Sequence, residues 1–235
     1  MSGFVGFLIA VLLLVPALLV AIPVHEMGHA LAAYLLGDKS VRYFGYFTLN
    51  PRRFLDPIGV LAVFVILTGW GRRVPVQPNR IRTGFQHVVH ELGGPAANLV
   101  VAIVLGLIYR LTGVGAEFSF SLGLVLFASL LYAIIFLNLS IFAFQLLPVP
   151  GLDGWGVVEG LFRNRFPRFF FQVNGRRREI QAGAFLLVVL YGLLQHASLL
   201  SILMAPFFLP ASLISVGECI PYVIPNLALL FPCLQ

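Results

Sequence analysis

Two histidines and a glutamate lie close together near the N-terminal end of the chain. His25, Glu26 and His29 form the pattern H-E-x-x-H. On a helix, residues i and i+4 project from one face, so both imidazoles can reach a single metal ion, with Glu26 beside them. Neutral imidazole is a typical ligand of Zn²⁺, and a catalytic zinc site uses three protein ligands and leaves a fourth position for water. The spacing therefore predicts one zinc ion bound by His25 and His29, and a third ligand from elsewhere.

An alternative explanation is that these residues merely fill polar positions in a helix bundle. They directly follow the apolar run 4–24, which is long enough to cross a membrane. Ionisable residues in such a segment are energetically expensive, and they usually mark a functional site. We therefore favour the metal site over the structural alternative.

Asp153 is the best candidate for the third ligand. It follows an apolar segment and lies in the sequence LLPVPGLDG, where Pro148, Pro150 and Gly151 must interrupt the preceding helix. A capping or turn role is the ordinary alternative for an aspartate in such a place. We favour the ligand, because the topology derived below puts Asp153 on the same side of the membrane as the histidines.

A second H-E pair, His90 and Glu91, does not complete a metal motif. Gly94 occupies the position where a second imidazole would lie. We expect this pair to line a polar region or to form an interhelical contact. The neighbouring sequence G-G-P-A-A-N at 93–98 is typical of close helix packing by small residues, with Asn98 as an interhelical hydrogen-bond donor.

The composition indicates a polytopic membrane protein. Of the 235 residues 60% are hydrophobic and 10% are charged, whereas a soluble domain has about 45–50% apolar and about 25% charged residues. A water-soluble enzyme is excluded on this ground. The net charge is +6, but the basic residues lack the interleaved aromatics of a nucleic-acid-binding groove, so no nucleic acid partner is expected. We expect a single integral membrane domain over residues 1–235.

The apolar segments predict an all-α fold, because about 20 apolar residues suffice for a helix to cross the hydrocarbon core. The first expected span, 4–24, continues without a break through the histidine motif to Gly37. The stretch 58–70 is too short to cross and is expected to be re-entrant. We expect a three-helix catalytic core, this re-entrant segment and about two further C-terminal transmembrane helices. The remaining expected spans are 92–109, 122–147, 182–195 and 199–216.

The distribution of charge predicts the topology. If 58–70 does not cross, the loops 37–87 and 160–180 lie on one side and contain every lysine and arginine except Arg110. Cytoplasmic loops of membrane proteins carry such an excess. We therefore expect the N-terminus outside. The first and third core spans then run in the same direction, so the histidine pair and Asp153 meet near the cytosolic surface.

Three motifs taken together give the chain a family resemblance: H-E-M-G-H at 25–29, G-G-P-A-A-N at 93–98 and Q-L-L-P-V-P-G-L-D-G at 145–154. On these motifs the chain resembles the site-2 protease family of intramembrane zinc metalloproteases, and within it the compact bacterial branch without a PDZ domain. The resemblance implies a catalytic core at about 4–160 and C-terminal helices at about 180–235, in a bacterial cell membrane.

The same resemblance implies the chemistry. One Zn²⁺ ion would be bound by His25, His29 and Asp153, with Glu26 as the general base. The reaction would hydrolyse a peptide bond within or near a transmembrane helix of a single-pass membrane-protein substrate. Since a peptide bond inside a helix is shielded, we expect the substrate to unwind and to pair as an extended strand with the loop at 41–49.

Three positions depart from the family pattern. Gln145 stands where members usually have an asparagine that holds the substrate, and glutamine keeps the same donor and acceptor on a longer stem. Asn138 offers another amide nearby, so Asn138 and Gln145 are the candidate substrate-binding residues. Phe54 replaces a histidine, and Gly151 replaces a proline. None of these departures removes a zinc ligand or the base.

Two other functions stay open on the sequence alone. A membrane metal-ion transporter could use the same histidines and aspartate, but the outer halves of the core spans are almost wholly apolar, and Glu26 would have no role. A catalytically inactive relative that binds membrane helices without cutting them is the second alternative. The sequence does not fix the oligomeric state.

Overall fold

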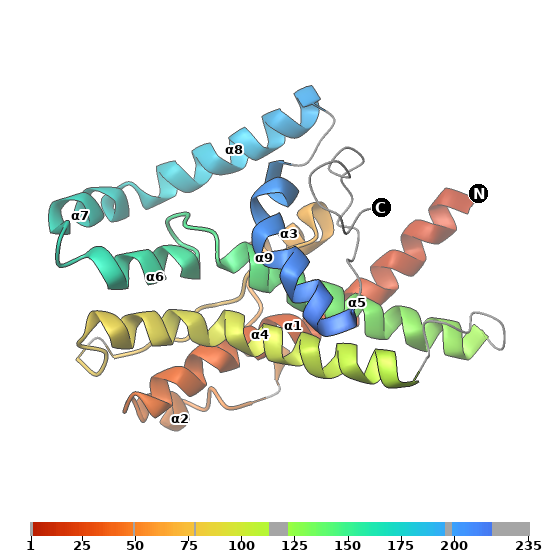
Figure 1. Ribbon diagram of the computed structural model, residues 1–235, viewed down its shortest axis with the longest axis horizontal. Coiled ribbons are helices and arrows are strands. Elements are labelled where there is room, and N and C mark those ends of the chain that lie inside the picture. The colour runs from red at the N-terminus through yellow and green to blue at the C-terminus, as the bar shows by residue number, and fades with distance from the viewer. Residues whose placement is uncertain (1, 49, 78, 113–121, 196–198, 218–235) are drawn as a thin grey trace.

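The computed structural model describes the chain except for residues 1, 49, 78, 113–121, 196–198 and 218–235. Across the described residues the regular secondary structure is helical, with two isolated bridges and no strand. Four of the described helices contain a segment that is long and apolar enough to cross a membrane. They are α1 (Ser2–Leu35), α4 (Gly84–Thr112), α5 (Leu122–Gln145) and α9 (Leu199–Val216) (Figure 1). The predicted all-α polytopic membrane fold is confirmed.

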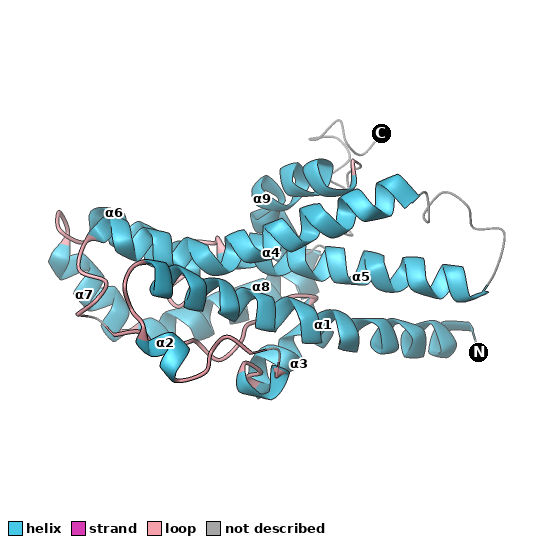
Figure 2. Cartoon of the chain, turned by 90° about the horizontal axis from the view of Figure 1, so that it is seen from below, coloured by secondary structure: helices cyan, strands magenta, loops and turns pink. Residues whose placement is uncertain are grey.

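The other described helices connect these four. Helices α6 and α7 lie at the end of the molecule opposite the N-terminus in both ribbon views (Figures 1 and 2). The connecting helices are α2 (Ser40–Tyr43), the 3₁₀ helix η1 (Pro51–Arg53), α3 (Pro57–Ile66), α6 (Asp153–Phe162), α7 (Pro167–Gly175) and α8 (Arg177–Gln195).

Helices α1, α4 and α5 pack side by side as the expected three-helix core. Helices α1 and α5 run in one direction and α4 runs in the other (Figure 1). The α1–α4 contact depends on two glycines, since a Cβ built on Gly93 would lie 2.7 Å from both the Gly28 oxygen and the Ala32 Cβ. Small residues at this crossing let the two backbones approach closely. The parallel course of α1 and α5 brings their C-terminal ends to the same end of the core, as expected.

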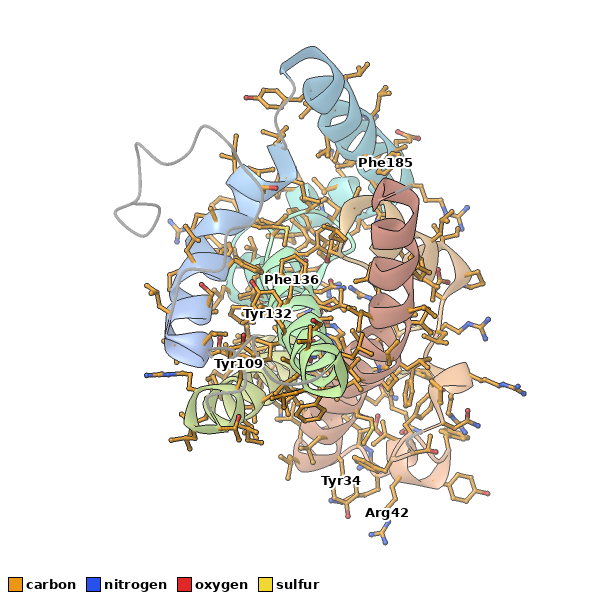
Figure 3. The ribbon with its side chains drawn as sticks, turned by 90° about the vertical axis from the view of Figure 1, so that its right-hand side faces the viewer. Tyr34, Arg42, Tyr109, Tyr132, Phe136 and Phe185 are labelled. Atoms are coloured by element: carbon orange, nitrogen blue, oxygen red, sulfur yellow. The ribbon has the colours of Figure 1, made fainter. Side chains whose placement is uncertain are left out.

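Helix α9 covers one side of this core. The ring of Tyr109 in α4 lies 6.3 Å from that of Tyr132 in α5, and Phe136 in α5 lies 5.8 Å from Phe208 in α9, measured between ring centroids (Figure 3). Gly106 of α4 faces the backbone oxygen of Ser215, which leaves no room for a side chain there. These contacts join α4, α5 and α9 into one apolar cluster.

The short apolar stretch expected to be re-entrant contains α3. Its N-terminus is capped by Asp56, whose side chain accepts hydrogen bonds from the backbone N–H groups of Ile58 and Gly59 at 3.0 and 2.9 Å. The helix ends at Leu67, which has a left-handed φ of 56°. Ten helical residues span only about 15 Å, half of a hydrocarbon core of about 30 Å. This length agrees with a segment that does not cross, and its re-entrant placement stays a prediction.

Several helix ends differ from the bounds of the expected spans, most clearly the start of α4. Helix α4 begins at Gly84 rather than at 92, because Thr83 and Gln86 form a capping box. The Thr83 hydroxyl accepts from Gln86 N at 3.1 Å, and the Gln86 side chain accepts from Thr83 N at 3.2 Å. At its far end α5 stops at Gln145 rather than 147, just before the proline-rich turn.

The two expected C-terminal crossings have different outcomes. The stretch 199–216 corresponds to α9, which is one of the four candidate spans. The stretch 182–195 is the C-terminal part of α8, which does not belong to these four among the described helices. Helix α8 begins with Arg177, Arg178 and Glu179, and these charges make it less suited to cross a membrane.

Candidate metal centre

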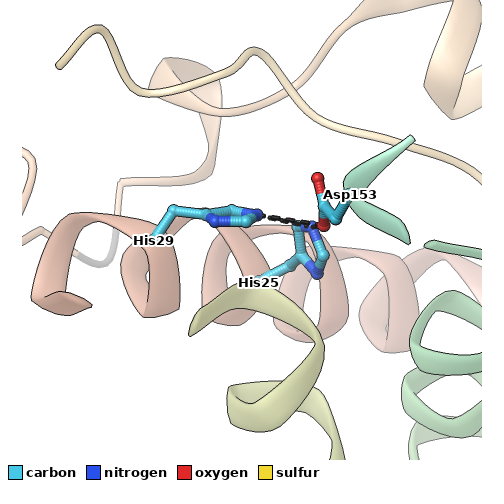
Figure 4. Close-up of side chains that lie close together, drawn as sticks. All are labelled: His25, His29 and Asp153. Carbon is cyan, nitrogen blue, oxygen red and sulfur yellow. Dashed lines mark hydrogen bonds and ion pairs between the residues drawn. The ribbon is translucent and has the colours of Figure 1, made fainter. Parts of the chain in front are cut away.

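The three predicted zinc ligands lie together inside the protein. His25 and His29 come from α1, and Asp153 is the first residue of α6 (Figure 4). The Nε2 atoms of the two histidines are 3.2 Å apart, and Asp153 Oδ2 lies 3.0 Å from His25 Nε2 and 3.1 Å from His29 Nε2. All three residues are buried. The fold thus brings the L-D-G turn to the same end of the core as the histidine pair.

The spacing of these three atoms fits a single zinc ion. Zinc binds histidine nitrogen and carboxylate oxygen at about 2.0–2.2 Å, so a tetrahedral site holds neighbouring ligand atoms roughly 3.3 Å apart. Gly94 of α4 faces the ligands, and a Cβ built on it would lie 2.7 Å from His25 Nε2 and would clash with His29 Nε2. A glycine at this position keeps the space beside the two imidazoles free, and the residues present therefore suit a resident zinc ion.

Hydrogen bonds on the far side of each imidazole orient its Nε2 atom. His25 Nδ1 donates to Asn98 Oδ1 at 2.7 Å, and His29 Nδ1 donates to the His90 carbonyl oxygen at 2.8 Å. Both partners are acceptors, so each Nδ1 carries the proton and each Nε2 presents its lone pair toward Asp153. This is the tautomer that a metal site needs.

Asn98 is held in the orientation that His25 requires. Its Nδ2 atom donates to the Ala21 oxygen of α1 at 3.0 Å and to Asn138 Oδ1 of α5 at 2.8 Å. Because the amide nitrogen has two acceptors, the amide oxygen must face His25. Asn98 is therefore the interhelical donor that the G-G-P-A-A-N sequence predicted, and it links α4 to both neighbours.

Asp153 follows a turn that only some residues can form. Gly151 has a φ of 104°, a left-handed conformation that favours glycine and that proline cannot adopt. This geometry explains why the chain departs from the family's usual proline there. Asp153 is buried, and with the positive charge of an ion beside it the carboxylate would be bound in its ionised form, as a metal ligand must be.

An extended segment packs over Glu26. We call residues 71–77 the strap. Val74 N–H of the strap donates to Glu26 Oε2 at 3.3 Å, and Glu26 is 2% exposed. Arg73 Nη2 donates to the Gly151 oxygen at 2.7 Å and lies 3.4 Å from Asp153 Oδ1. The strap thereby contacts both the candidate base and the third candidate ligand.

Comparison with known proteins gives the family. Over 152 residues the chain is 38% identical to a Bacillus subtilis protein named "Putative zinc metalloprotease YwhC", with 63% of this chain and 68% of that protein covered. This chain belongs to the site-2 protease family. The resemblance inferred from the three motifs is confirmed.

Further relatives of this site-2 protease carry the same kind of name. It is 34% identical over 163 residues to "Putative zinc metalloprotease Rip2" of Mycolicibacterium smegmatis and 35% identical over 148 residues to Rip2 of Mycobacterium tuberculosis. These matches cover 67% and 60% of this chain, and 59% and 54% of the relatives. The chain thus spans less than two thirds of the two Rip2 proteins. No family model and no solved structure matches it.

Asn138, which the sequence suggested as a substrate-binding residue, lies inside the helix bundle. It is fully buried, its Oδ1 accepts from Asn98, and its Nδ2 donates to the Ile134 oxygen at 2.8 Å. Both ends of the amide form hydrogen bonds inside the bundle, where Asn138 supports Asn98, and its substrate role stays a prediction. Gln145, the last residue of α5, is buried at 4% exposure, and its substrate role stays a prediction.

Part of the loop expected to pair with the substrate is helical. Residues Ser40–Tyr43 form α2, and the Phe44 and Tyr46 N–H groups donate to Ser40 and Val41 oxygens at 2.8 and 3.0 Å. Some backbone groups of this loop are thus used in local turns, and the pairing of the substrate with 41–49 stays a prediction. Phe54, which replaces a histidine of the family pattern, is fully buried in the neighbouring core.

His90 and Glu91 lie beside the metal-ligand group without joining it. The His90 carbonyl positions His29, and His90 Nδ1 lies 3.5 Å from Glu91 Oε1. Among the described residues the group that could hold a metal contains only His25, His29 and Asp153. These contacts agree with the predicted polar lining.

The sequence reasoning gave no role to Arg73 and Val74 of the strap. A usable signal was present, because V-P-V-Q-P begins at Val74 and closely spaced prolines favour extended backbone over helix. What the extended segment would contact could not be inferred from that signal.

Proposed function

We propose that this chain is an intramembrane zinc endopeptidase that hydrolyses a peptide bond within or near a transmembrane helix of a single-pass membrane protein. The observation that carries the proposal is the buried group of two imidazole nitrogens and one carboxylate oxygen, 3.0–3.2 Å apart, with Glu26 adjacent to His25 in the chain. The names of the relatives support zinc and peptidase chemistry. The four apolar helices support a membrane location and hence a membrane-bound substrate.

In this proposal His25, His29 and Asp153 hold the ion. When bound, zinc lowers the pKa of a water molecule toward about 7 and polarises a substrate carbonyl. The Glu26 carboxylate takes a proton from the attacking water and passes it to the amine of the leaving peptide. The hydrogen bond from Val74 N–H fixes Oε2 of Glu26, so we assign the proton transfer to Oε1.

We further propose that the metal centre faces the cytosol and that the N-terminus lies outside. By the chain order of the spans, the segments 37–87 and 160–180 lie at the same end of the core as Asp153, and they contain every lysine and arginine except Arg110. Arg110, the remaining basic residue, is at the opposite end of α4. This asymmetry matches the excess of basic residues in cytoplasmic loops.

A cleavage assay with the purified protein in detergent tests the proposed function. The substrates are a panel of single-pass transmembrane segments, each with a detectable tag at both ends. We expect the parent to cleave at least one of them, and a zinc chelator to stop cleavage until zinc is restored. Glu26→Gln should lower the rate about 10²–10⁴-fold, because a positioned general base contributes that much, while zinc binding persists. Glu179→Gln, an exposed carboxylate on α8, is the matched control and should cleave at the parent rate.

Other outcomes of this assay identify the competing functions. Zinc binding without cleavage of any substrate, in the parent and in Glu26→Gln alike, would indicate the inactive relative. Zinc flux into liposomes that contain the protein, again without cleavage, would indicate a transporter. Cleavage at an equal rate by the parent and Glu26→Gln would contradict the assigned base.

A further inference from the structure

The link between α6 and α7 exposes aromatic and cationic side chains together. Every residue from Leu161 to Phe169 is exposed, in the sequence LFRNRFPRF. This stretch contains three phenylalanines, Phe162, Phe166 and Phe169, which are 47%, 51% and 53% exposed. Three arginines lie between them in the sequence. We call residues 161–171 the Arg-Phe segment. Aromatic side chains in this number are unusual on a surface that meets only water.

The Arg-Phe segment is held in a fixed position. Phe170 is 2% exposed, and its ring lies 5.3 Å from that of Trp155 in α6. Trp155 Nε1 donates to Asn174 Oδ1 at 2.9 Å, and the Asn174 amide nitrogen donates to both Glu159 oxygens at 3.0–3.1 Å. With Phe170 turned inward, its neighbours Phe169 and Phe171 are turned outward, and Phe171 is 82% exposed. The packing of α7 against α6 therefore keeps the rings of Phe169 and Phe171 exposed.

The charge of this surface is strongly positive. Arginines occupy positions 163, 165, 168, 176, 177 and 178, and the acidic residues between 159 and 179 are Glu159 and Glu179. Glu159 already contacts Arg163 at 3.6 Å and Asn174. A hollow of about 580 Å³ lies against the segment, with Arg163, Arg168, Phe171 and Gln172 in its lining. The surface thus offers apolar rings, cationic groups and a concave site in one place.

An anionic membrane surface can bind both the aromatic and the cationic side chains of this segment. Aromatic rings partition into the interface between headgroups and acyl chains, and guanidinium groups bind phosphate oxygens in a bidentate manner. The segment lies at the end of the molecule opposite the N-terminus, the end toward which the core helices α1 and α5 run (Figure 1). We propose that the Arg-Phe segment is a docking surface for the headgroups of anionic phospholipids in the leaflet nearest the metal centre. The proposal rests on the membrane location of the chain and does not depend on peptidase activity.

Lipid retention by the whole purified chain tests this proposal. The protein is exchanged into detergent containing equal amounts of phosphatidylglycerol and phosphatidylcholine, and bound lipids are counted by native mass spectrometry. We expect the parent to retain phosphatidylglycerol preferentially, and high salt to weaken that preference. The variant R163Q/R165Q/R168Q should lose most of it, since each basic residue near an anionic surface contributes roughly a fivefold change in binding.

Two variants separate a local site from a general charge effect. R52Q/R80Q/R82Q removes the same charge from exposed arginines outside the Arg-Phe segment and should keep the preference. R163K/R165K/R168K keeps the local charge and should keep most of it, which guards against a folding defect in the glutamine variant. Equal retention of both lipids by the parent, or an equal loss in the two glutamine variants, would overturn the proposal. Preferential capture of an acidic peptide, with no lipid preference, would assign the surface to a protein partner and would also overturn it.

Discussion

The metal centre depends on residues that do not themselves reach the ion. His25 and His29 present Nε2 lone pairs only because Asn98 Oδ1 and the His90 oxygen accept their Nδ1 protons. In the other tautomer each histidine would point an N–H group at Asp153, and neither could bind a cation. The amide of Asn98 is fixed in turn by Ala21 and Asn138. Binding of zinc therefore requires the correct arrangement of three helices.

At this scale we predict that Asn98→Ala lowers the zinc affinity about 10–100-fold, the usual cost of losing a partner that orients a ligand. The reason is that His25 loses the acceptor that sets its tautomer. Competition with a chromophoric chelator, on the purified protein, measures the affinity. Asn79→Ala, an exposed asparagine before α4, is the control and should bind zinc as the parent does. Unchanged affinity in Asn98→Ala would contradict the role given to this hydrogen bond.

At the scale of elements, the strap connects parts of the molecule that the core helices leave apart. Its backbone is fixed at several points, since Arg72 N donates to the Phe54 oxygen at 2.6 Å and Gln77 N donates to Asp38 Oδ2 at 2.8 Å. Burial would raise the pKa of Asp38, but hydrogen bonds from Gln77 N–H and from the hydroxyl and N–H of Ser40 hold that pKa below its ordinary value. Between these anchors, Val74 and Arg73 contact Glu26 and the turn before α6.

We predict that Arg73→Ala lowers the cleavage rate by about tenfold or more, because Asp153 and the Gly151 carbonyl lose the group that bridges them. Arg73→Lys should recover only part of the rate, since an ammonium lacks the planar fork that reaches two acceptors. Arg72→Ala, its exposed neighbour, is the matched control and should be close to the parent. Rates are measured with the tagged transmembrane substrates. A higher rate in Arg73→Ala would show instead that the strap blocks the site.

At the scale of the whole molecule, the candidate ligands join two distant parts of the chain. His25 and His29 belong to α1, and Asp153 opens α6, so that His29 and Asp153 are 124 positions apart in the chain. A bound ion therefore connects the first helix to the C-terminal part of the molecule. Because the unfolded chain cannot offer this ligand set, zinc binding should add directly to the free energy of unfolding.

We predict that removal of zinc lowers the melting temperature of the purified protein. At a zinc concentration about 1,000 times the dissociation constant, binding stabilises the folded state by about 4 kcal/mol. Differential scanning fluorimetry, with a chelator and then with zinc restored, measures the shift. His29→Ala should melt at the same temperature with and without the chelator, because it lacks a ligand. An equal chelator effect on the parent and His29→Ala would show that the stabilising metal binds elsewhere.

The sequence by itself determined the features that depend on residues close together in the chain. H-E-x-x-H gives two ligands on one helical face, long apolar runs give the core helices, and the prolines before L-D-G end α5. The charge of the loops predicted the parallel course of α1 and α5, and hence the meeting of His29 and Asp153. The capping box at Thr83 was equally local and could have placed the start of α4 correctly.

Only the tertiary structure decided which amides and backbone groups serve the site. Asn138 supports Asn98 inside the bundle, Ser40–Tyr43 form a helical turn in the loop after α1, and the strap lies beside Glu26. The decisive hydrogen bonds join residues 73 positions apart for His25 and Asn98, and 48 apart for Glu26 and Val74. Local propensity carries no information about such pairs, because a hydrogen bond forms between whichever groups the packing of distant segments brings within reach.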